Sequence, residues 1–266
     1  MMRLLKSLLS IACMFALFST GNVNAQERKK PLISKTWSRI QKKSYDFKDA
    51  GKEMEYCLYV PSKYDQSKKT PLMLALHGLG SNPQQIIRYP GLTELAEEYG
   101  YIIAAPMGYN SSGWYGNAPP FLKANPSNLY ELSEQDVMNV LGICRKDFNI
   151  DADRMYLMGH SMGGGGTLHL GIKYPDLWAG LAPIAPAVFR KPDELEKMKH
   201  VPVILVQGEK DNLVPARRVR PWAEKMKELK MTHEYIEVPG GDHINVIDEM
   251  PKIFDFLNQH KKSEKK

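Results

Sequence analysis

Residues 154–166 read RMYLMGHSMGGGG, and this stretch decides the fold. Its first five residues form a short, mostly apolar run, which is typical of a strand buried on both faces of a sheet. Glycines then flank His160, Ser161 and Met162, and residues 165–174 suit a helix. A buried strand that turns sharply into a helix is the repeating unit of a sheet covered by helices. The stretch therefore predicts an α/β protein.

Further strand-like segments occur on both sides of this stretch. Strands are predicted at residues 53–60, 71–76, 101–105, 178–184, 201–206 and 233–238. The first of them ends at Pro61 and reads as an outer strand, whereas residues 71–76 (PLMLAL) have the continuous apolar character of a central one.

Helix-like segments alternate with the strands. Apolar residues at helical spacing predict helices at residues 92–99, 137–148 and 219–229. Ser133 and Asp136 form a capping-box signal before the second helix, and Pro251 suits the first turn of a C-terminal helix. Repeated strand and helix units imply a mostly parallel central sheet of about eight strands with helices on both faces. Ligands of such sheets bind beyond the carboxyl ends of the strands.

The N-terminal residues do not belong to this pattern. Arg3 and Lys6 precede an apolar run at residues 8–18, and small or polar residues follow as far as Ala25. A basic start, a short apolar run and a small-residue ending predict a secretory signal peptide, residues 1–25, cleaved after Ala25. The run is too short for a membrane span, which needs about 20 residues. We therefore expect an exported protein, secreted or periplasmic, without stable membrane insertion.

Charge and composition narrow the class of partner. The 266 residues carry a net charge of +6, and the positive excess is scattered rather than gathered on one helix. Nucleic acid is therefore not expected as a partner. We expect a lead-in at residues 26–43, one folded domain at residues 44–260 and a solvated basic tail at residues 261–266.

The chain has three cysteines. Cys13 lies in the predicted signal peptide, where the alternative is a lipid attachment site. Cys57 and Cys144 lie in a predicted strand and a predicted helix. Two separate buried thiols are therefore favoured over a disulfide between them, although export would permit pairing.

Ser161 is the candidate nucleophile. Residues 159–163 match the pattern Gly-x-Ser-x-Gly, between a predicted buried strand and a predicted helix. This is the setting of a nucleophile elbow, in which a tight turn leaves the serine hydroxyl exposed at the edge of the sheet. The alternative is a phosphate-binding turn. In such a turn a lysine directly follows the glycines, and here no lysine stands in that place.

A serine hydroxyl needs a positioned base, and the base needs an orienting carboxylate. Asp211 follows the strand predicted at residues 201–206, and His243 follows the last predicted strand. Both therefore lie at the same sheet edge as Ser161, in the order Ser, acid, His that this type of sheet requires. Glu209 and Asp242 are the alternative acids.

The charge that develops on the carbonyl oxygen needs two backbone N–H donors. Met162 directly follows the candidate nucleophile and is predicted to supply one of them. Leu79, in the glycine-containing turn at residues 77–80, is predicted to supply the other. The alternative for that turn is an ordinary flexible loop.

Four motifs together resemble the α/β-hydrolase superfamily. They are L-H-G-x-G at residues 76–80, G-H-S-M-G-G at residues 159–164, D-x-x-V-P at residues 211–215 and G-x-x-H at residues 240–243. Within the superfamily the chain is most similar to the group of polyhydroxybutyrate depolymerases, feruloyl esterases and acetylxylan esterases, over about residues 45–258. The resemblance implies an α/β-hydrolase fold and a small-molecule or polymer-linked ester as substrate.

The loop at residues 108–120 contains Trp114 and Tyr115 and is expected near the nucleophile. These two aromatic residues, together with His160, are candidate substrate contacts. The alternative is that the aromatic residues pin a long loop to the body of the domain.

The motifs predict an acyl-enzyme ester hydrolase that needs no cofactor and no metal, because no His, Cys or Asp cluster has ligand spacing. A serine peptidase with the same three residues and a non-catalytic carbohydrate-binding relative are the rival hypotheses. The sequence does not specify the oligomeric state.

Overall fold

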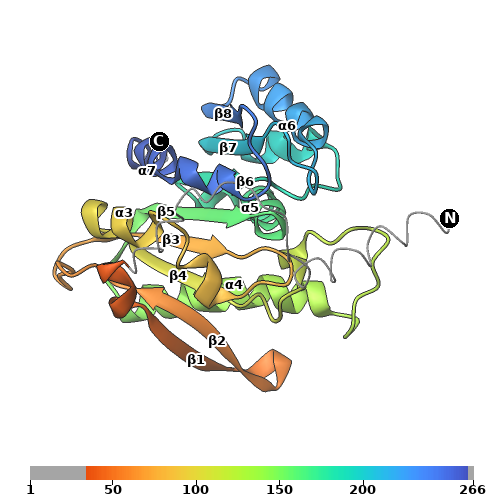
Figure 1. Cartoon of the computed structure of the whole chain (residues 1–266). Coiled ribbons are helices and arrows are strands. Elements are labelled where there is room, and N and C mark those ends of the chain that lie inside the picture. The colour runs from red at the N-terminus through yellow and green to blue at the C-terminus, as the bar shows by residue number, and fades with distance from the viewer. Residues whose placement is uncertain (1–33, 263–266) are drawn as a thin grey trace, which may run out of the picture. The chain divides into compact units, whose positions relative to one another are not determined.

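The computed structural model describes residues 34–262. The predicted signal peptide lies outside the described residues, as do residues 26–33 of the predicted lead-in. Within the described part, strands form one sheet (Figure 1): β1 (Gln41–Phe47), β2 (Lys52–Tyr59), β3 (Thr70–Leu76), β4 (Ile102–Pro106), β5 (Ile150–His160), β6 (Gly180–Ile184), β7 (Val203–Gly208) and β8 (His233–Val238).

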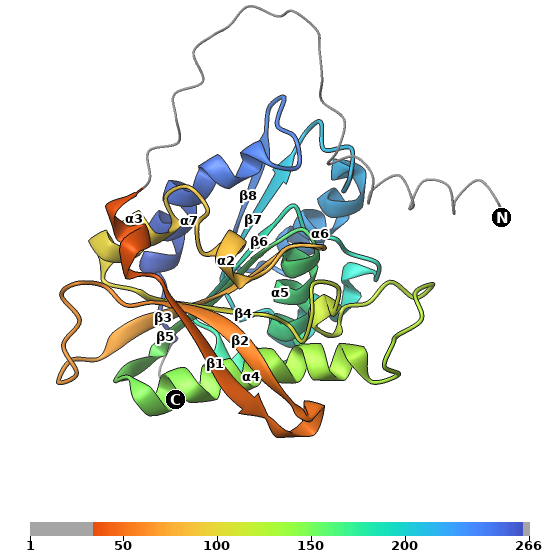
Figure 2. The same cartoon turned by 60° about the horizontal axis from the view of Figure 1, so that its bottom comes forward.

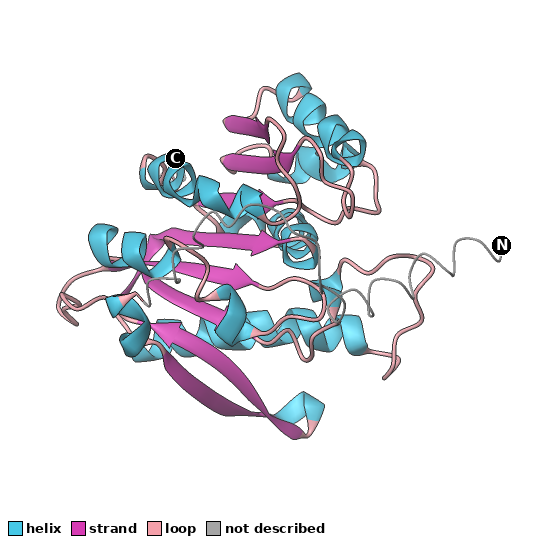
Figure 3. Ribbon diagram, in the orientation of Figure 1, coloured by secondary structure: helices cyan, strands magenta, loops and turns pink. Residues whose placement is uncertain are grey.

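The sheet has eight strands in the order β1-β2-β4-β3-β5-β6-β7-β8 (Figure 3). β2 runs antiparallel to both of its neighbours, β1 and β4. Every other neighbouring pair, from β4 across to β8, is parallel. The mostly parallel sheet predicted from the sequence is therefore confirmed. Because the parallel strands share one direction, the loops at their carboxyl ends meet at one edge.

Helices cover both faces of the sheet. They are α2 (Pro83–Ile86), α3 (Leu92–Tyr99), α4 (Leu129–Asp147), α5 (Met162–Lys173), α6 (Ala216–Glu228) and α7 (Met250–Asn258). Leu72 and Leu74 of β3 pack in one core cluster with residues of α4, α5 and α6. Met73 and Ala75 point the other way and pack with residues of α3 and α7. Figure 2 shows α4 and the α3–α7 pair on opposite sides of the sheet.

β1 is the one strand that the sequence analysis missed. Its residues, QKKSYDF, are mostly polar and exposed, so they carry no apolar alternation. The strand forms because it pairs along its whole length with β2, from Gln41 opposite Leu58 to Phe47 opposite Lys52. Two corrections follow. β1, not β2, is the outer strand, and it starts at Gln41, inside the segment expected to be a lead-in.

The capping box predicted at Ser133 and Asp136 is wrong, because α4 begins before both residues. Both side chains instead hold the loop between β4 and α4. The Ser133 hydroxyl accepts the Tyr115 N–H at 3.0 Å. The Asp136 carboxylate accepts the Tyr45 hydroxyl at 2.5 Å and the Gly108 N–H at 2.6 Å. Burial raises the pKa of Asp136 to about 6, although these hydrogen bonds act in the opposite direction.

The two cysteines of the described chain are free and buried. Cys57 belongs to the core cluster on the α3 and α7 face, and Cys144 to the cluster on the α4 face. The prediction of two separate thiols is therefore confirmed. Burial raises the pKa of Cys57 to about 11 and that of Cys144 to about 12, so neither is a reactive thiolate at neutral pH. No helix of residues 34–262 is long and apolar enough to cross a membrane.

Candidate active site

Ser161 lies at the sharp turn between β5 and α5. Its backbone has φ 58° and ψ −114°, a conformation that non-glycine residues rarely adopt and that costs on the order of 1–3 kcal/mol. Three backbone hydrogen bonds hold it there. The Ser161 N–H donates to Ile184 O at 2.9 Å, and Ser161 O accepts the amides of Gly165 (3.0 Å) and Ala187 (2.9 Å). A strained backbone conformation that several hydrogen bonds maintain is typical of functional sites.

The glycines of the motif are required by close packing. A Cβ placed on Gly159 would lie 2.3 Å from Gly163 O, and one on Gly163 would lie 2.1 Å from Leu76 O. Both distances are far below van der Waals contact. The pattern Gly-x-Ser-x-Gly therefore lets α5 start against β5 and β3 without a clash.

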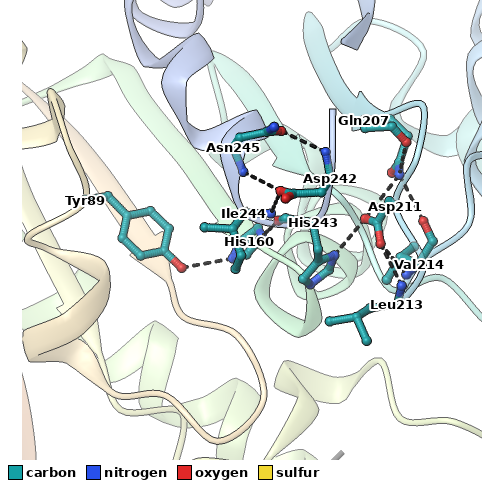
Figure 4. Close-up of polar contacts among 11 residues, drawn as sticks. Tyr89, His160, Gln207, Asp211, Leu213, Val214, Asp242, His243, Ile244 and Asn245 are labelled. Carbon is teal, nitrogen blue, oxygen red and sulfur yellow. Dashed lines mark hydrogen bonds and ion pairs between the residues drawn. The ribbon is translucent and has the colours of Figure 1, made fainter. Parts of the chain in front are cut away.

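Asp211 and His243 contact each other (Figure 4), and the His243 ring packs against His160, the residue before Ser161. His243 Nδ1 and Asp211 Oδ2 are 2.7 Å apart, and both residues are buried. The other carboxylate oxygen, Oδ1, accepts the backbone amides of Leu213 and Val214, each at 2.8 Å. Gln207 Nε2 also contacts Oδ2, at 3.3 Å. The carboxylate is therefore fixed on two sides, with one oxygen aimed at the imidazole.

The electrostatics of Asp211 suit an orienting acid. Burial raises the pKa of this carboxyl, but hydrogen bonds from His243 and from the Val214 and Leu213 amides outweigh burial and hold the pKa below its ordinary value. The carboxylate therefore remains ionised at neutral pH, and it can accept the Nδ1–H of His243. In the neutral tautomer with its proton on Nδ1, Nε2 is the acceptor that a general base requires.

The two alternative acids have other partners. Glu209 Oε2 accepts the Gly240 amide at 2.6 Å. Asp242 Oδ1 accepts the backbone amides two and three residues ahead, both at 2.8 Å, and so caps its own turn. Of the three carboxylates considered from the sequence, only Asp211 is paired with the His243 ring.

Ser161 Oγ and His243 share no hydrogen bond among the described residues. The two residues are linked through His160, which directly precedes Ser161. The rings of His160 and His243 have centroids 4.8 Å apart.

The two candidate oxyanion donors belong to segments next to Ser161. Met162 is the first residue of α5. Leu79 follows Gly78, and a Cβ placed on Gly78 would lie 3.4 Å from the Ser161 Cβ. Neither the Leu79 nor the Met162 amide has a hydrogen-bond partner among the residues that the structure describes. The buried His77 ring fixes this turn, because its nitrogens lie 2.8 Å from Gly78 O and 2.8 Å from Met107 O.

Trp114 and Tyr115 are not exposed substrate platforms, which corrects that prediction. Trp114 is 6% exposed and Tyr115 is fully buried. The Tyr115 hydroxyl donates to His77 O at 3.3 Å. The aromatic residues therefore pin the β4–α4 loop to the body of the domain and support the turn that carries Leu79.

His160 is also not a substrate contact, because it is 3% exposed and both ring nitrogens have partners in the protein. Nε2 lies 2.7 Å from His243 O, and Nδ1 lies 2.9 Å from the Tyr89 hydroxyl. A carbonyl oxygen can only accept, so Nε2 carries the proton and Nδ1 accepts from Tyr89. Burial, and after it the positive charge of a protonated His243, lower the pKa of His160 to about 4. His160 therefore ties the backbone of His243 to the serine turn as a neutral ring.

Sequence reasoning missed Tyr89. It contacts His160 across 71 positions of the chain, and it lies in a segment without any motif.

Neutral His160 makes the stability of the protein depend on pH. Its pKa is about 4 in the folded chain against an ordinary 6.5. Between these values only the unfolded chain binds the proton, so stability falls as the pH falls from 6.5 to 4, by about 3 kcal/mol from this residue. We expect His160→Gln to flatten this part of the profile, measured by urea unfolding at a series of pH values. Tyr89→Phe, which keeps the buried imidazole, should retain the wild-type slope. Equal slopes for wild type and His160→Gln would contradict this account.

Two hollows on the described chain include none of the reactive residues of the site. One, of about 360 Å³, is lined by residues of α5, α6 and the segment before β7, among them Gly165, Lys173 and Trp222. The other, of about 470 Å³, lies along the β4–α4 loop. Ser161 and His243 line neither. Among the described residues, no group of three or more His, Cys, Asp or Glu side chains could hold a metal ion.

Comparison with known proteins identifies related chains. "Putative esterase NocK" from Nocardia uniformis subsp. tsuyamanensis is 30% identical over 168 residues, which cover 62% of this chain and 47% of NocK. "S-formylglutathione hydrolase" from Bos taurus is 28% identical over 167 residues, which cover 58% of this chain and 59% of that protein. The chain thus spans about half the length of these curated relatives.

A solved structure of a CE1 ferulic acid esterase from Anaeromyces mucronatus, in complex with ferulic acid, has a TM-score of 0.66 to this chain. The two are 21% identical, and the match covers 92% of this chain and 98% of the other. At this identity the likeness shows a shared fold, so the expected α/β-hydrolase fold is confirmed. Residues 48–246 also match the family model described as "Putative esterase". Because this match spans well over half of the 266 residues, the chain belongs to that esterase family.

Proposed function

We propose that this protein is an exported serine esterase that hydrolyses carboxylic esters through Ser161, His243 and Asp211. One observation carries the proposal. A buried imidazole and carboxylate, with 2.7 Å between His243 Nδ1 and Asp211 Oδ2, lie beside a serine held in a strained turn. Membership of the esterase family supports the same reaction class.

In the first half of the reaction Ser161 Oγ attacks the carbonyl carbon of the ester, and His243 Nε2 takes the hydroxyl proton. The amides of Leu79 and Met162 donate to the negatively charged oxygen of the tetrahedral intermediate. When the carbonyl re-forms, the bond to the alcohol oxygen breaks. The alcohol leaves with the proton from His243, and the acyl group stays on Ser161.

In the second half a water molecule attacks the acyl carbon and gives its proton to His243 Nε2. The bond to Ser161 Oγ then breaks, the serine recovers the proton, and the carboxylic acid is released. Asp211 holds the imidazole in the required tautomer and stabilises the imidazolium that forms twice in each cycle. No cofactor takes part in these steps.

His160 and Tyr89 act as positioning residues in this proposal. The bond from His160 Nε2 to His243 O fixes the backbone of the catalytic loop beside the serine turn. Because His160 is neutral at physiological pH, it adds no positive charge next to the imidazolium.

The substrate class is an ester of a carboxylic acid. The motif resemblance favours feruloyl or acetyl sugar esters, short-chain esters or a soluble polyester, and the relation to S-formylglutathione hydrolase adds a thioester. The test is a panel of these compounds with p-nitrophenyl acetate as reference, assayed beside aminoacyl p-nitroanilides. Ester turnover with little amide turnover is expected, because an amine leaves less readily than an alcohol. Preferential anilide cleavage would support a peptidase instead, and no turnover at all would support the non-catalytic hypothesis.

Export is part of the proposal and rests on the pattern of residues 1–25. Mass measurement of the mature protein recovered outside the cytoplasm is expected to find a chain that begins at Gln26. An intact N-terminus in the cytoplasmic fraction would contradict export.

A further inference from the structure

Five large apolar side chains are exposed in the described chain: Leu79 (49%), Phe121 (62%), Leu122 (40%), Leu213 (57%) and Ile244 (62%). We call them the apolar rim. All five belong to loops that follow carboxyl ends of parallel strands, namely β3, β4, β7 and β8. None lies on a helix, on the outer strand or at the opposite edge of the sheet.

Three members of the apolar rim lie close to the proposed catalytic groups, two of them as neighbours in the sequence and one through packing. Leu213 donates its N–H to Asp211, and Ile244 directly follows His243. Figure 4 shows the Leu213 and Ile244 side chains on opposite sides of the His243 imidazole. Leu79 lies in the turn that packs against Ser161.

A row of aromatic rings connects the serine turn with Phe121. The Ala187 N–H donates to Ser161 O, and Phe189 follows two residues later. The Phe189 ring lies edge-on to Trp114, with centroids 5.4 Å apart, and to Phe121, with centroids 6.0 Å apart. The exposed Phe121 ring is therefore linked through Phe189 to the segment that bonds the serine turn.

Single exposed apolar residues are common and need no explanation, but a cluster around a reactive group marks a binding surface. Much of the area of these side chains faces solvent, although the Phe121 ring also packs edge-on against Phe189. Water leaves this area when an apolar group covers it, which favours binding. A compact polar group would gain nothing there.

We infer that the apolar rim binds the apolar group of the ester and makes the protein select substrates with a large hydrophobic acyl or alcohol group. This inference rests on the proposed function, because it places that group beside an ester held at Ser161. The group that covers the apolar rim is part of the substrate.

The test compares wild type with Ile244→Ser and Phe121→Ser. Two substrate series are used: p-nitrophenyl acetate, butyrate and hexanoate for the acyl side, and ethyl, butyl and hexyl acetate for the alcohol side. The wild type is expected to prefer the long members of at least one series. In each serine variant the ratio of kcat/KM for the longest to the shortest member should fall about fivefold, mainly through KM. Ile244→Leu and Phe121→Leu, which keep an apolar surface, should retain most of the preference.

The outcomes separate this inference from the proposed function. Measurable acetate turnover with unchanged ratios in both series would overturn the role of the apolar rim and leave the esterase intact. A wild type that prefers the shortest member of each series would overturn it as well. Absence of ester turnover in the wild type would overturn the proposed function, and the inference that rests on it.

Discussion

Ser161→Ala is expected to lower kcat for p-nitrophenyl acetate by about 10⁶-fold, in practice to the background rate. The alanine removes the only oxygen that can form the acyl-enzyme, whereas the oxyanion donors and the rest of the site remain. The fold should persist, because the three hydrogen bonds that hold this turn involve backbone atoms only. Steady-state kinetics and urea unfolding of the purified variant measure both effects.

A matched control is Ser44→Ala. Ser44 lies on the exposed strand β1, and its hydroxyl donates to Glu53 on β2. This pair is far along the chain from the serine turn. Its replacement should leave kcat within about twofold, as is usual for a surface change. A Ser161→Ala protein that folds normally and still hydrolyses the ester would remove the serine from the mechanism.

Asp211→Asn is expected to reduce kcat by about 10⁴-fold. The Leu213 and Val214 amides require an acceptor at Oδ1, so the new NH₂ group would face His243 Nδ1. A donor at that position forces Nδ1 to be the acceptor and moves the proton to Nε2. The imidazole then cannot accept a proton from Ser161, although its position is nearly unchanged. Single-turnover and steady-state rates of the purified variant measure this loss.

Glu209→Gln and Asp242→Asn are the matched controls for Asp211. Each keeps an oxygen acceptor for the backbone amides that it now binds, so we expect changes of less than about threefold. A large loss in either control, together with an active Asp211→Asn enzyme, would assign the acid to another carboxylate.

The serine turn was predictable because its signal is local. The buried strand, the two glycines and the helix occupy one continuous stretch, and close packing of Gly163 against Leu76 requires that composition. The positions of Asp211 and His243 after two later strands followed from the parallel sheet, since carboxyl ends of parallel strands meet at one edge.

What could not be predicted depends on contacts between distant residues. β1 exists through pairing with β2, and its polar sequence carries no local signal. Ser133 and Asp136 have the spacing of a helix cap, yet their oxygens accept amides from the β4–α4 loop instead. The link from Tyr89 through His160 to His243 joins three separate segments, so no window of sequence contains it.

The sequence also did not predict which aromatic residues of the β4–α4 loop are exposed. Trp114 and Tyr115 have the composition of a binding loop, but their rings face inward, and Phe121 farther along the same loop is exposed instead. Residue type alone does not tell which side of a loop faces solvent, because that depends on how the loop folds back on α4.

The measurement that tests the central claim most directly is covalent labelling with a fluorophosphonate, followed by peptide mass mapping. A fluorophosphonate reacts with a serine activated by a neighbouring base and does not require knowledge of the natural ester. We predict one adduct, on the peptide that contains Ser161, lost in Ser161→Ala and formed much more slowly in Asp211→Asn. An unlabelled wild type, or an adduct on another residue that persists in Ser161→Ala, would contradict the account.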